Sequence, residues 1–250
     1  MGIGTEVPLS GSGDKKQITL TSKKQIEAES LRFKNILKSL NLQDKSFGLV
    51  IEPGMKYMHS SITRPNFNNF LGKKKISKKN NFVFEAHSTD YQSKNILRKL
   101  VSNNFKFLKV GPELTYNYSR ALFFMHDIEK RILKKNNSEI KKNILLSMQK
   151  NKQYWKGYYN EKNKELFLNS KLDRMRYYFN SKLVVKSLKI LKNNINKLDK
   201  EIILTFIEKD KKKDFLNYKK EKLSNFDNIK LIYISKSLKK YFHACGFNFS

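Results

Sequence analysis

Cysteine is nearly absent from this sequence: Cys245 is the single one among 250 residues. One thiol cannot build a disulfide framework, so a disulfide-stabilised extracellular scaffold is excluded and a reducing cytoplasm is expected. No apolar run approaches the ~18 residues that span a bilayer. The first residues also lack the basic and apolar regions of a secretory signal. We therefore expect a cytoplasmic protein with no membrane partner.

Acidic residues and arginine are also scarce. The chain has 52 Lys and Arg against 22 Asp and Glu, a formal net charge of +30. Such a charge is typical of nucleic-acid-binding proteins, but arginine is the residue that contacts phosphates and bases bidentately. The arginines are few: Arg32, Arg64, Arg98, Arg120, Arg131, Arg174 and Arg176. We interpret most of the charge as lysine on solvated faces and disfavour nucleic acid as a partner.

Four short apolar runs in the first half of the chain predict β-strands. Each is rich in β-branched or aromatic residues and closes at Pro, Gly or a polar cluster. The runs are Gly2–Val7, Phe47–Gly54, Asn81–His87 and Phe105–Pro112. Because helical spacing follows at least three of them, the pattern predicts βαβ units and a parallel sheet.

Capping residues and lysine runs refine this prediction. Thr21 or Ser22 can cap one helix and Asp90 another, and a third helix follows Pro112. The connection 57–80 is rich in lysine and predicts a helix only weakly. Beyond about residue 134 helical spacing dominates. The runs Lys73–Lys79 and Lys209–Lys213 are typical of solvated loops.

Polar residues gather where the predicted strands end. Glu6 ends the first run and Glu52 lies on the second. Glu85 and His87 close the third run, and Lys109 lies on the fourth. Because ligands of parallel α/β sheets bind at the carboxyl ends of the strands, these residues are candidates for metal or acid–base chemistry. A single His at a strand end is also compatible with a purely structural hydrogen bond.

The substrate or phosphate candidates are Glu85, Ser88, Lys109 and Gly111, since Gly111 precedes a helix whose first amides could hold a phosphate. His126 and His243 lie in helical pattern, where a structural role is expected. The clusters "QYWKGYY" and "DRMRYYF" could stack bases, although aromatic stripes at helical spacing favour a core.

Six segments resemble one known family. "IGTEVPLSGSG", "IEPGMKYMHSSI", "FEAHSTDYQ", "LKVGPELTYNYSRALF", "KQYWKGYY" and "DRMRYYF" occur in that order. Together they resemble the GatZ/KbaZ family, the non-catalytic subunits of class II D-tagatose-1,6-bisphosphate aldolase. The resemblance runs from Gly2 almost to Cys245.

The resemblance implies a (β/α)8 TIM barrel of the class II aldolase type with a helical C-terminal extension. Residues 1–135 would then be the last four βα units, the second half of a barrel, and 136–250 a mainly helical region. We expect a fragment, a mis-called start or a split protein whose missing N-terminal half-barrel carries an Asp-His pair.

The function implied is an accessory, stabilising subunit in carbohydrate metabolism. Its partners would be the class II aldolase catalytic subunit and a phosphorylated sugar. In class II aldolases a divalent metal is held by His and Glu side chains at strand ends, so the resemblance makes Glu6 and His87 candidate metal ligands and Zn²⁺ a candidate cofactor. Glu52, however, stands in a Glu-Pro-Gly turn where the family usually has Gln-Pro-Gly. Two alternatives stay open. One is an enzyme acting itself on a phosphorylated sugar, as an aldolase or a tagatose-6-phosphate kinase, with Glu6, His87 and Asp90 as the catalytic candidates. The other is a basic nucleic-acid-binding protein.

Overall fold

The computed structural model describes residues 2–3, 20–44, 47–70, 72–134, 136–218 and 223–247. They form two compact units, which we call the sheet unit (up to Gly111, and again from Lys240) and the helical unit (Pro112–Lys239). The division lies at residues 111 and 239 rather than at the expected 135. The reason is that the long helix after Gly111 packs with later helices.

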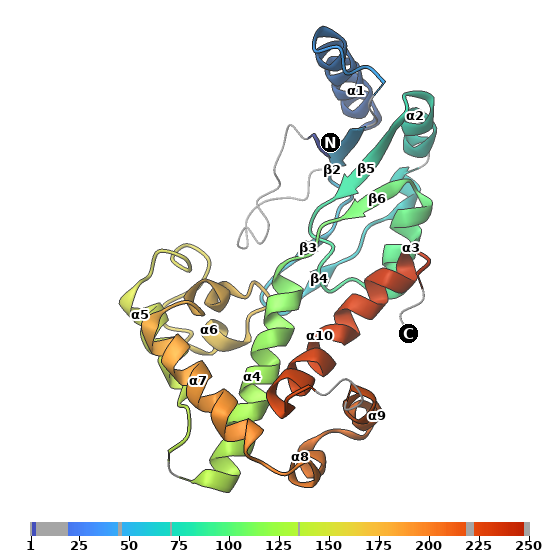
Figure 1. Ribbon diagram of the computed structural model, residues 1–250. Helices are drawn as coiled ribbons and strands as arrows, with labels where there is room; N and C mark the ends of the chain where they lie inside the picture. Colours follow the sequence, from blue (N-terminus) through green and yellow to red (C-terminus); the bar gives the residue numbers. More distant parts are fainter. Residues whose placement is uncertain are drawn as a thin grey trace. The chain divides into compact units, whose positions relative to one another are not determined.

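The sheet unit contains four parallel strands in chain order (Figure 1). They are β1 (Gly2–Ile3), β2 (Phe47–Ile51), β5 (Phe82–Ala86) and β6 (Phe105–Leu108). The four predicted strands and their parallel pairing are therefore confirmed. The register places Val50 opposite Glu85, and Glu85 opposite Phe107.

Serine side chains begin the two helices whose caps the sequence indicated. Helix α1 (Lys23–Ser39) follows Ser22, whose hydroxyl accepts from the Gln25 amide while its own amide donates to the Gln25 side chain. Helix α3 (Lys94–Ser102) is capped by Ser93. The expected Asp90 cap was wrong, because the Asp90 carboxylate accepts instead from the backbone amide of Gly111.

The connection between β2 and β5 holds four short elements. They are the antiparallel pair β3 (Lys56–Tyr57) and β4 (Ile62–Thr63), the 3-10 turn η1 (Phe67–Phe70) and helix α2 (Lys73–Lys79). The helix weakly predicted in the connection 57–80 is therefore confirmed as α2. It contains the first lysine run, which was expected to be a solvated loop, and the second run lies in α9 (Lys209–Tyr218). Lysine is a good helix former, so a run of lysines does not by itself indicate a loop.

Only one face of the sheet is covered by the core. The side chains on this face pack against α1, α3 and the last turn of α10 (Asn225–Ala244). The buried strand residues are Leu49, Ile51, Phe82, Phe84, Ala86 and Phe105. The opposite face carries Val50, Val83 and Glu85, which are half-buried, and Phe107, which is 48% exposed. Alternation along a strand sends neighbouring side chains to opposite faces, so this second face is apolar and partly open.

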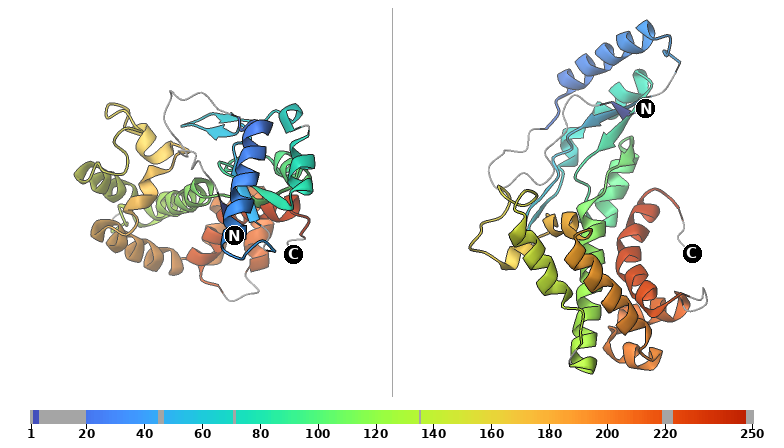
Figure 2. Two further views of the ribbon diagram at one scale, coloured as in Figure 1. Left: turned by 90° about the horizontal axis from the view of Figure 1, so that it is seen from above. Right: turned by 60° about the vertical axis from the view of Figure 1, so that its left-hand side comes forward.

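The helical unit is built around α4 (Pro112–Leu133), which packs with α5 (Ile140–Lys150) and α7 (Lys182–Asn196) (Figure 2). Shorter elements complete it: α6 (Glu165–Asn169), η2 (Arg174–Tyr178), α8 (Lys200–Phe206), α9 and most of α10. Among the described helices, none is both long and apolar enough to cross a bilayer.

A buried carboxylate joins three parts of the helical unit. Glu129 on α4 is fully buried, lies 2.8 Å from His126 Nδ1, and accepts from the Ser138 amide and the Asn194 side chain. Burial alone would raise the pKa of Glu129, but these hydrogen bonds hold it below its ordinary value. His126 therefore has the structural role that the sequence indicated.

A second buried acid, Asp173, has the opposite shift. Its carboxyl is fully buried, and one oxygen accepts from the Thr115 hydroxyl while the other has no hydrogen-bond partner. Burial raises the pKa of Asp173 to about 7, against the lowering effects of Thr115, Arg176 and Arg120. The fold thus favours the protonated form of this acid.

Asp173 should make the stability of the chain fall as pH rises. A folded-state pKa above the unfolded value means that stability is present at low pH and is lost on the way to pH 7. Between pH 4 and 8 we expect the free energy of unfolding of the wild type to fall by on the order of 3 kcal/mol. Asp173→Asn should not show this fall. Urea titrations at several pH values measure it. The exposed acid Asp210 supplies the control, Asp210→Asn, and an Asp173→Asn profile that matches the wild type would contradict the expectation.

Candidate functional site

Glu85 and His87 form a pair at the carboxyl end of β5. Residues two apart on an extended chain point to the same side, which brings His87 Nε2 to 2.9 Å from Glu85 Oε1. The His87 side chain is 8% exposed and that of Glu85 is 21% exposed. The imidazole therefore has one ring nitrogen committed to its own neighbour.

The polar residues after this pair bind the main chain. Thr89 is fully buried, and its hydroxyl donates to the Lys109 carbonyl at 2.7 Å. Asp90 is 2% exposed and accepts from the Gly111 amide at 2.9 Å. The side-chain amide of Gln92 donates to the Thr63 carbonyl at 2.8 Å. These three side chains tie the loop after β5 to the segment after β6 and to β4.

The same loop has an uncommon backbone. Ser88 has φ of 55° and Tyr91 has φ of 63°, a region that residues with a side chain rarely enter. Two left-handed residues in four reverse the chain tightly, so Thr89 and Asp90 point back toward the sheet unit's interior. A loop held this closely is suited to fixing the end of β6.

Glu52 also serves the backbone. Its carboxylate accepts from the amides of Gly54 at 2.9 Å and Met55 at 3.3 Å, while its own amide donates to the Thr21 hydroxyl. Burial raises the pKa of Glu52, and the two amide hydrogen bonds counteract it. Gly54 has φ of 85°, so the Glu-Pro-Gly sequence forms a turn that the glutamate stabilises.

The structure brings most of the sequence-predicted residues to one edge of the sheet. Glu85, His87 and Asp90 lie there, and the Lys109 amide donates to the Ala86 carbonyl at 2.9 Å. The Lys109 side chain is exposed, and a side chain added at Gly111 would meet nothing within 4 Å. Glu6 lies outside the described residues. The roles in phosphate binding and catalysis stay predictions.

A catalytic metal does not fit the residues seen at this edge. Protein zinc sites use three or four ligands, and His87 and Glu85 are already bonded to each other. Within the described ranges, no group of three or more His, Cys, Asp or Glu side chains could hold a metal ion. We therefore derive no step that uses a metal.

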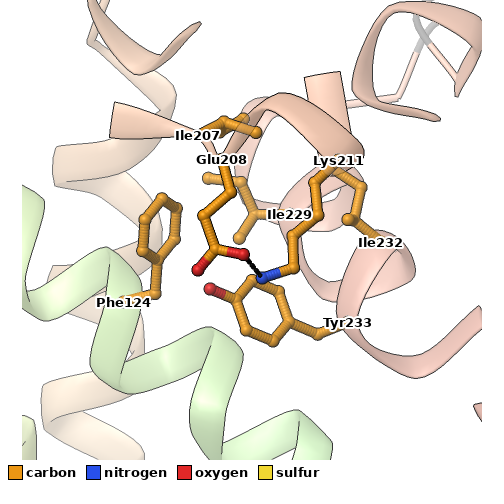
Figure 3. A pocket seen from close by; sticks show the side chains of 7 residues that line it. All are labelled: Phe124, Ile207, Glu208, Lys211, Ile229, Ile232 and Tyr233. Carbon is orange, nitrogen blue, oxygen red and sulfur yellow. Dashed lines mark hydrogen bonds and ion pairs between the residues drawn. The ribbon is translucent and has the colours of Figure 1, made fainter. Parts of the chain in front are cut away.

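Two cavities lie away from this edge. In the helical unit, Phe124, Glu208, Lys211 and Tyr233 line a cavity of about 10 Å³ (Figure 3), room for about one water. In the sheet unit a larger cavity of about 330 Å³ lies at the other end of β5. It is lined by Lys34, Asn35, Leu37, Lys38, Gln43, Lys79, Asn80 and Asn81. These are solvated lysines and amides, with one hydrogen bond of 3.0 Å from Lys34 to Asn80.

Tyr241 is a residue of this edge that the sequence did not indicate. It is 8% exposed, and its hydroxyl donates to the Thr89 carbonyl at 2.9 Å. The two residues are 152 positions apart, and periodicity reports only local structure. The helical spacing expected beyond about residue 134 is confirmed here by α10. Nothing in that spacing predicts a contact with the loop after β5.

Comparison with known proteins gives a family match. The family described as "D-tagatose-1,6-bisphosphate aldolase subunit GatZ/KbaZ-like" matches residues 2–246. The D-tagatose-1,6-bisphosphate aldolase subunit GatZ of Escherichia coli O1:K1 / APEC is 32% identical over 207 residues, 79% of this chain and 49% of that protein. The GatZ protein of Shigella boydii serotype 18 is 31% identical over the same shares. The chain thus spans about half the length of these curated relatives.

A solved structure shares the fold. The crystal structure of a probable tagatose 6-phosphate kinase from Sinorhizobium meliloti 1021 superposes with a TM-score of 0.81 at 21% identity. The match covers 98% of this chain and 62% of that chain. It shows a similar mixed α/β fold.

Removing the Asp90 carboxylate should destabilise the chain. Asp90→Ala would remove the hydrogen bond that the buried Asp90 carboxylate accepts from the Gly111 amide, so we expect the free energy of unfolding to fall by about 1–3 kcal/mol. Lys109→Ala, an exposed neighbour, should change it by less than about 0.5 kcal/mol. Chemical denaturation measures both. Equal, small effects of the two substitutions would show that the loop does not depend on Asp90.

Proposed function

The chain belongs to the GatZ/KbaZ-like family of D-tagatose-1,6-bisphosphate aldolase subunits, and we propose that it is an accessory, non-catalytic subunit. In this role it binds and stabilises a class II aldolase catalytic chain in carbohydrate metabolism. The curated relatives are named as subunits of that aldolase. We place the complex in the cytoplasm, in keeping with the single cysteine.

One observation carries the non-catalytic role: the polar residues after β5 are bonded to the main chain. Thr89, Asp90 and Gln92 each hold a backbone carbonyl or amide. A general acid or base must reach the substrate with its reactive atoms, and these atoms are engaged inside the fold. Glu85 and His87 are bonded to each other instead, and among the described residues no group of three or more His, Cys, Asp or Glu side chains could complete a metal site with them.

The phosphorylated sugar belongs to the same proposal. A phosphate would approach the exposed Lys109 side chain, near Gly111, whose amide donates to Asp90. Glu85 and Ser88 would contact sugar hydroxyls from the other side of the loop. In this arrangement the accessory chain would bind the phosphorylated sugar without cleaving it.

We further propose that the four strands are half of a (β/α)8 barrel. Parallel strands in chain order, with helices on one face, are the arrangement of that barrel. Its inner face would be the open side of the sheet, where Val83 is half-buried and Phe107 is 48% exposed. The remaining four βα units would come from a further segment, in the same polypeptide or in another chain.

The accessory role predicts how activity responds to His87→Ala. The chain is produced together with a class II D-tagatose-1,6-bisphosphate aldolase chain from the same genome, and cleavage of the bisphosphate is measured. We expect copurification, a longer half-life of activity, and a rate within about twofold of wild type for His87→Ala. A residue acting as a general acid or base would cost about 10²–10⁴-fold.

Controls separate the alternatives. The chain alone, with Zn²⁺ added, should not cleave the bisphosphate. Turnover by the chain alone, abolished by His87→Ala, would assign the activity to this chain. Failure of the wild-type chain to bind or to protect the aldolase would remove the accessory role.

The half-barrel proposal predicts an exposed apolar surface. The isolated chain should bind a hydrophobic fluorescent dye, because the described residues leave the second face of the sheet partly exposed and pair no strand with the outer edges of β1 and β6. Coexpression with the part of an Escherichia coli GatZ protein that lies outside the matched region should reduce the dye signal and yield a stable complex. Phe107→Ser should weaken that complex more than Leu216→Ser, a change at an exposed apolar residue of α9. A cooperatively melting monomer that binds no dye would overturn the proposal.

A further inference from the structure

Three tyrosines and two arginines form a stack on the helical unit, in which Tyr154 and Tyr177 are exposed and the other members are half-buried; we call it the Tyr–Arg stack. Its members are Tyr154, Tyr158, Arg174, Arg176 and Tyr177. The Arg174 guanidinium carbon lies 3.7 Å from the centre of the Tyr158 ring and 4.9 Å from that of Tyr177. Arg176 lies 4.4 Å from the Tyr177 ring, and the Tyr154 and Tyr177 rings are stacked at 5.1 Å. Each guanidinium thus lies against at least one ring.

The fold holds this stack in place from below. Arg174 Nε donates to the Tyr154 carbonyl at 2.6 Å, and Arg176 donates to the carbonyls of Leu172 and Asp173, each at 2.8 Å. The buried side chains of the same two motifs form the core beneath: Trp155, Tyr159, Met175 and Tyr178. The expected core role of the two motifs therefore applies to these four residues, while the stack faces outward.

The stack is open and positively charged. Tyr154 is 36% exposed and Tyr177 is 43% exposed. In the part of the chain that the structure describes, neither Arg174 nor Arg176 has an ion pair with a carboxylate within 4.0 Å. Among the described residues, seven lysines have such partners, for example Lys141 and Lys152. The two guanidinium groups are instead oriented by carbonyls and rings, although Arg176 also acts electrostatically on the buried Asp173.

We propose that the Tyr–Arg stack is the surface that binds a partner protein presenting carboxylate side chains. Resting on the proposed function, this partner is the class II aldolase catalytic chain. Tyrosine and arginine are enriched in the residues that dominate protein–protein binding energy. Preorganised side chains lose little entropy on binding, and paired carboxylate–guanidinium hydrogen bonds give the contact direction.

Other occupants fit this surface less well. A base of nucleic acid needs an open ring face for stacking, but the Tyr177 ring is already in contact with Arg174, Arg176 and Tyr154. A second copy of this chain would bring another +30 of formal charge to a positive surface. An acidic protein surface can pair with the guanidinium groups, and it needs no open ring face and brings no like charge.

Binding to the aldolase chain of the same genome is measured by titration calorimetry with the full chain. We expect Tyr177→Ser to weaken the affinity at least about tenfold. The double substitution Arg174→Lys/Arg176→Lys keeps the charge but removes the planar groups, and should weaken it by a similar factor. Melting temperatures are measured alongside, so that Tyr177→Ser reports on binding even where the arginine variant is less stable.

Matched controls leave the stack intact. Leu216→Ser changes a side chain of similar exposure, 46%, on the same unit. Arg32→Lys/Arg98→Lys replaces two exposed arginines of the sheet unit. Both should bind the aldolase chain as the wild type does.

The outcomes distinguish this inference from the proposed function. If the wild type binds the aldolase chain and the stack variants bind equally well, the Tyr–Arg stack is not the interface, while the accessory role stands. If the wild type does not bind at all, the proposed function fails, and the partner named here with it. A labelled 20-nucleotide single-stranded DNA at physiological salt completes the test. Loss of DNA binding in the stack variants, with aldolase binding unchanged, would assign the surface to nucleic acid and overturn the proposal.

Discussion

The parallel pairing of β2, β5 and β6 is the constraint on which the sheet unit depends. It sets Val50 beside Glu85 and Glu85 beside Phe107, and so fixes which side chains meet the helices and which meet the open face. Because every strand runs the same way, all carboxyl ends lie at one edge. The segments after β5 and β6 are therefore close in space, and the Thr89 hydroxyl can reach the Lys109 carbonyl.

The polar sequence after β5 is best understood as an internal connector. Burying Thr89 and Asp90 would be unfavourable if their polar atoms had no partners, and each finds one in the main chain of the β6 segment. Tyr241 adds a hydrogen bond from the last turn of α10. A cluster that looks catalytic in the sequence thus stabilises the end of the sheet.

Local signals allowed much of the sheet unit to be predicted, and non-local contacts account for the rest. The strands were predicted from short apolar runs, and Ser22, one of the two residues expected to cap the first helix, is its N-cap. Asp90 is also a residue type that often caps helices, but its carboxylate accepts instead from the backbone amide of Gly111, 21 positions away. The lysine run of α2 was misassigned because its buried member, Lys73, packs over the Phe70 ring, a contact that no periodicity reveals. The division at Gly111 depends likewise on packing between distant helices.

In this chain lysine lies mainly on solvated surfaces, whereas several arginines make specific contacts. Lysine carries a compact, strongly hydrated charge, whereas the guanidinium group is planar and can stack and donate in fixed directions. Three of the few arginines, Arg120, Arg174 and Arg176, lie against aromatic rings and donate to backbone carbonyls in the helical unit. A charge that arose only from composition would not select this residue at these places. The large net charge is therefore a poor guide to the partner, and the placement of the arginines is the better one.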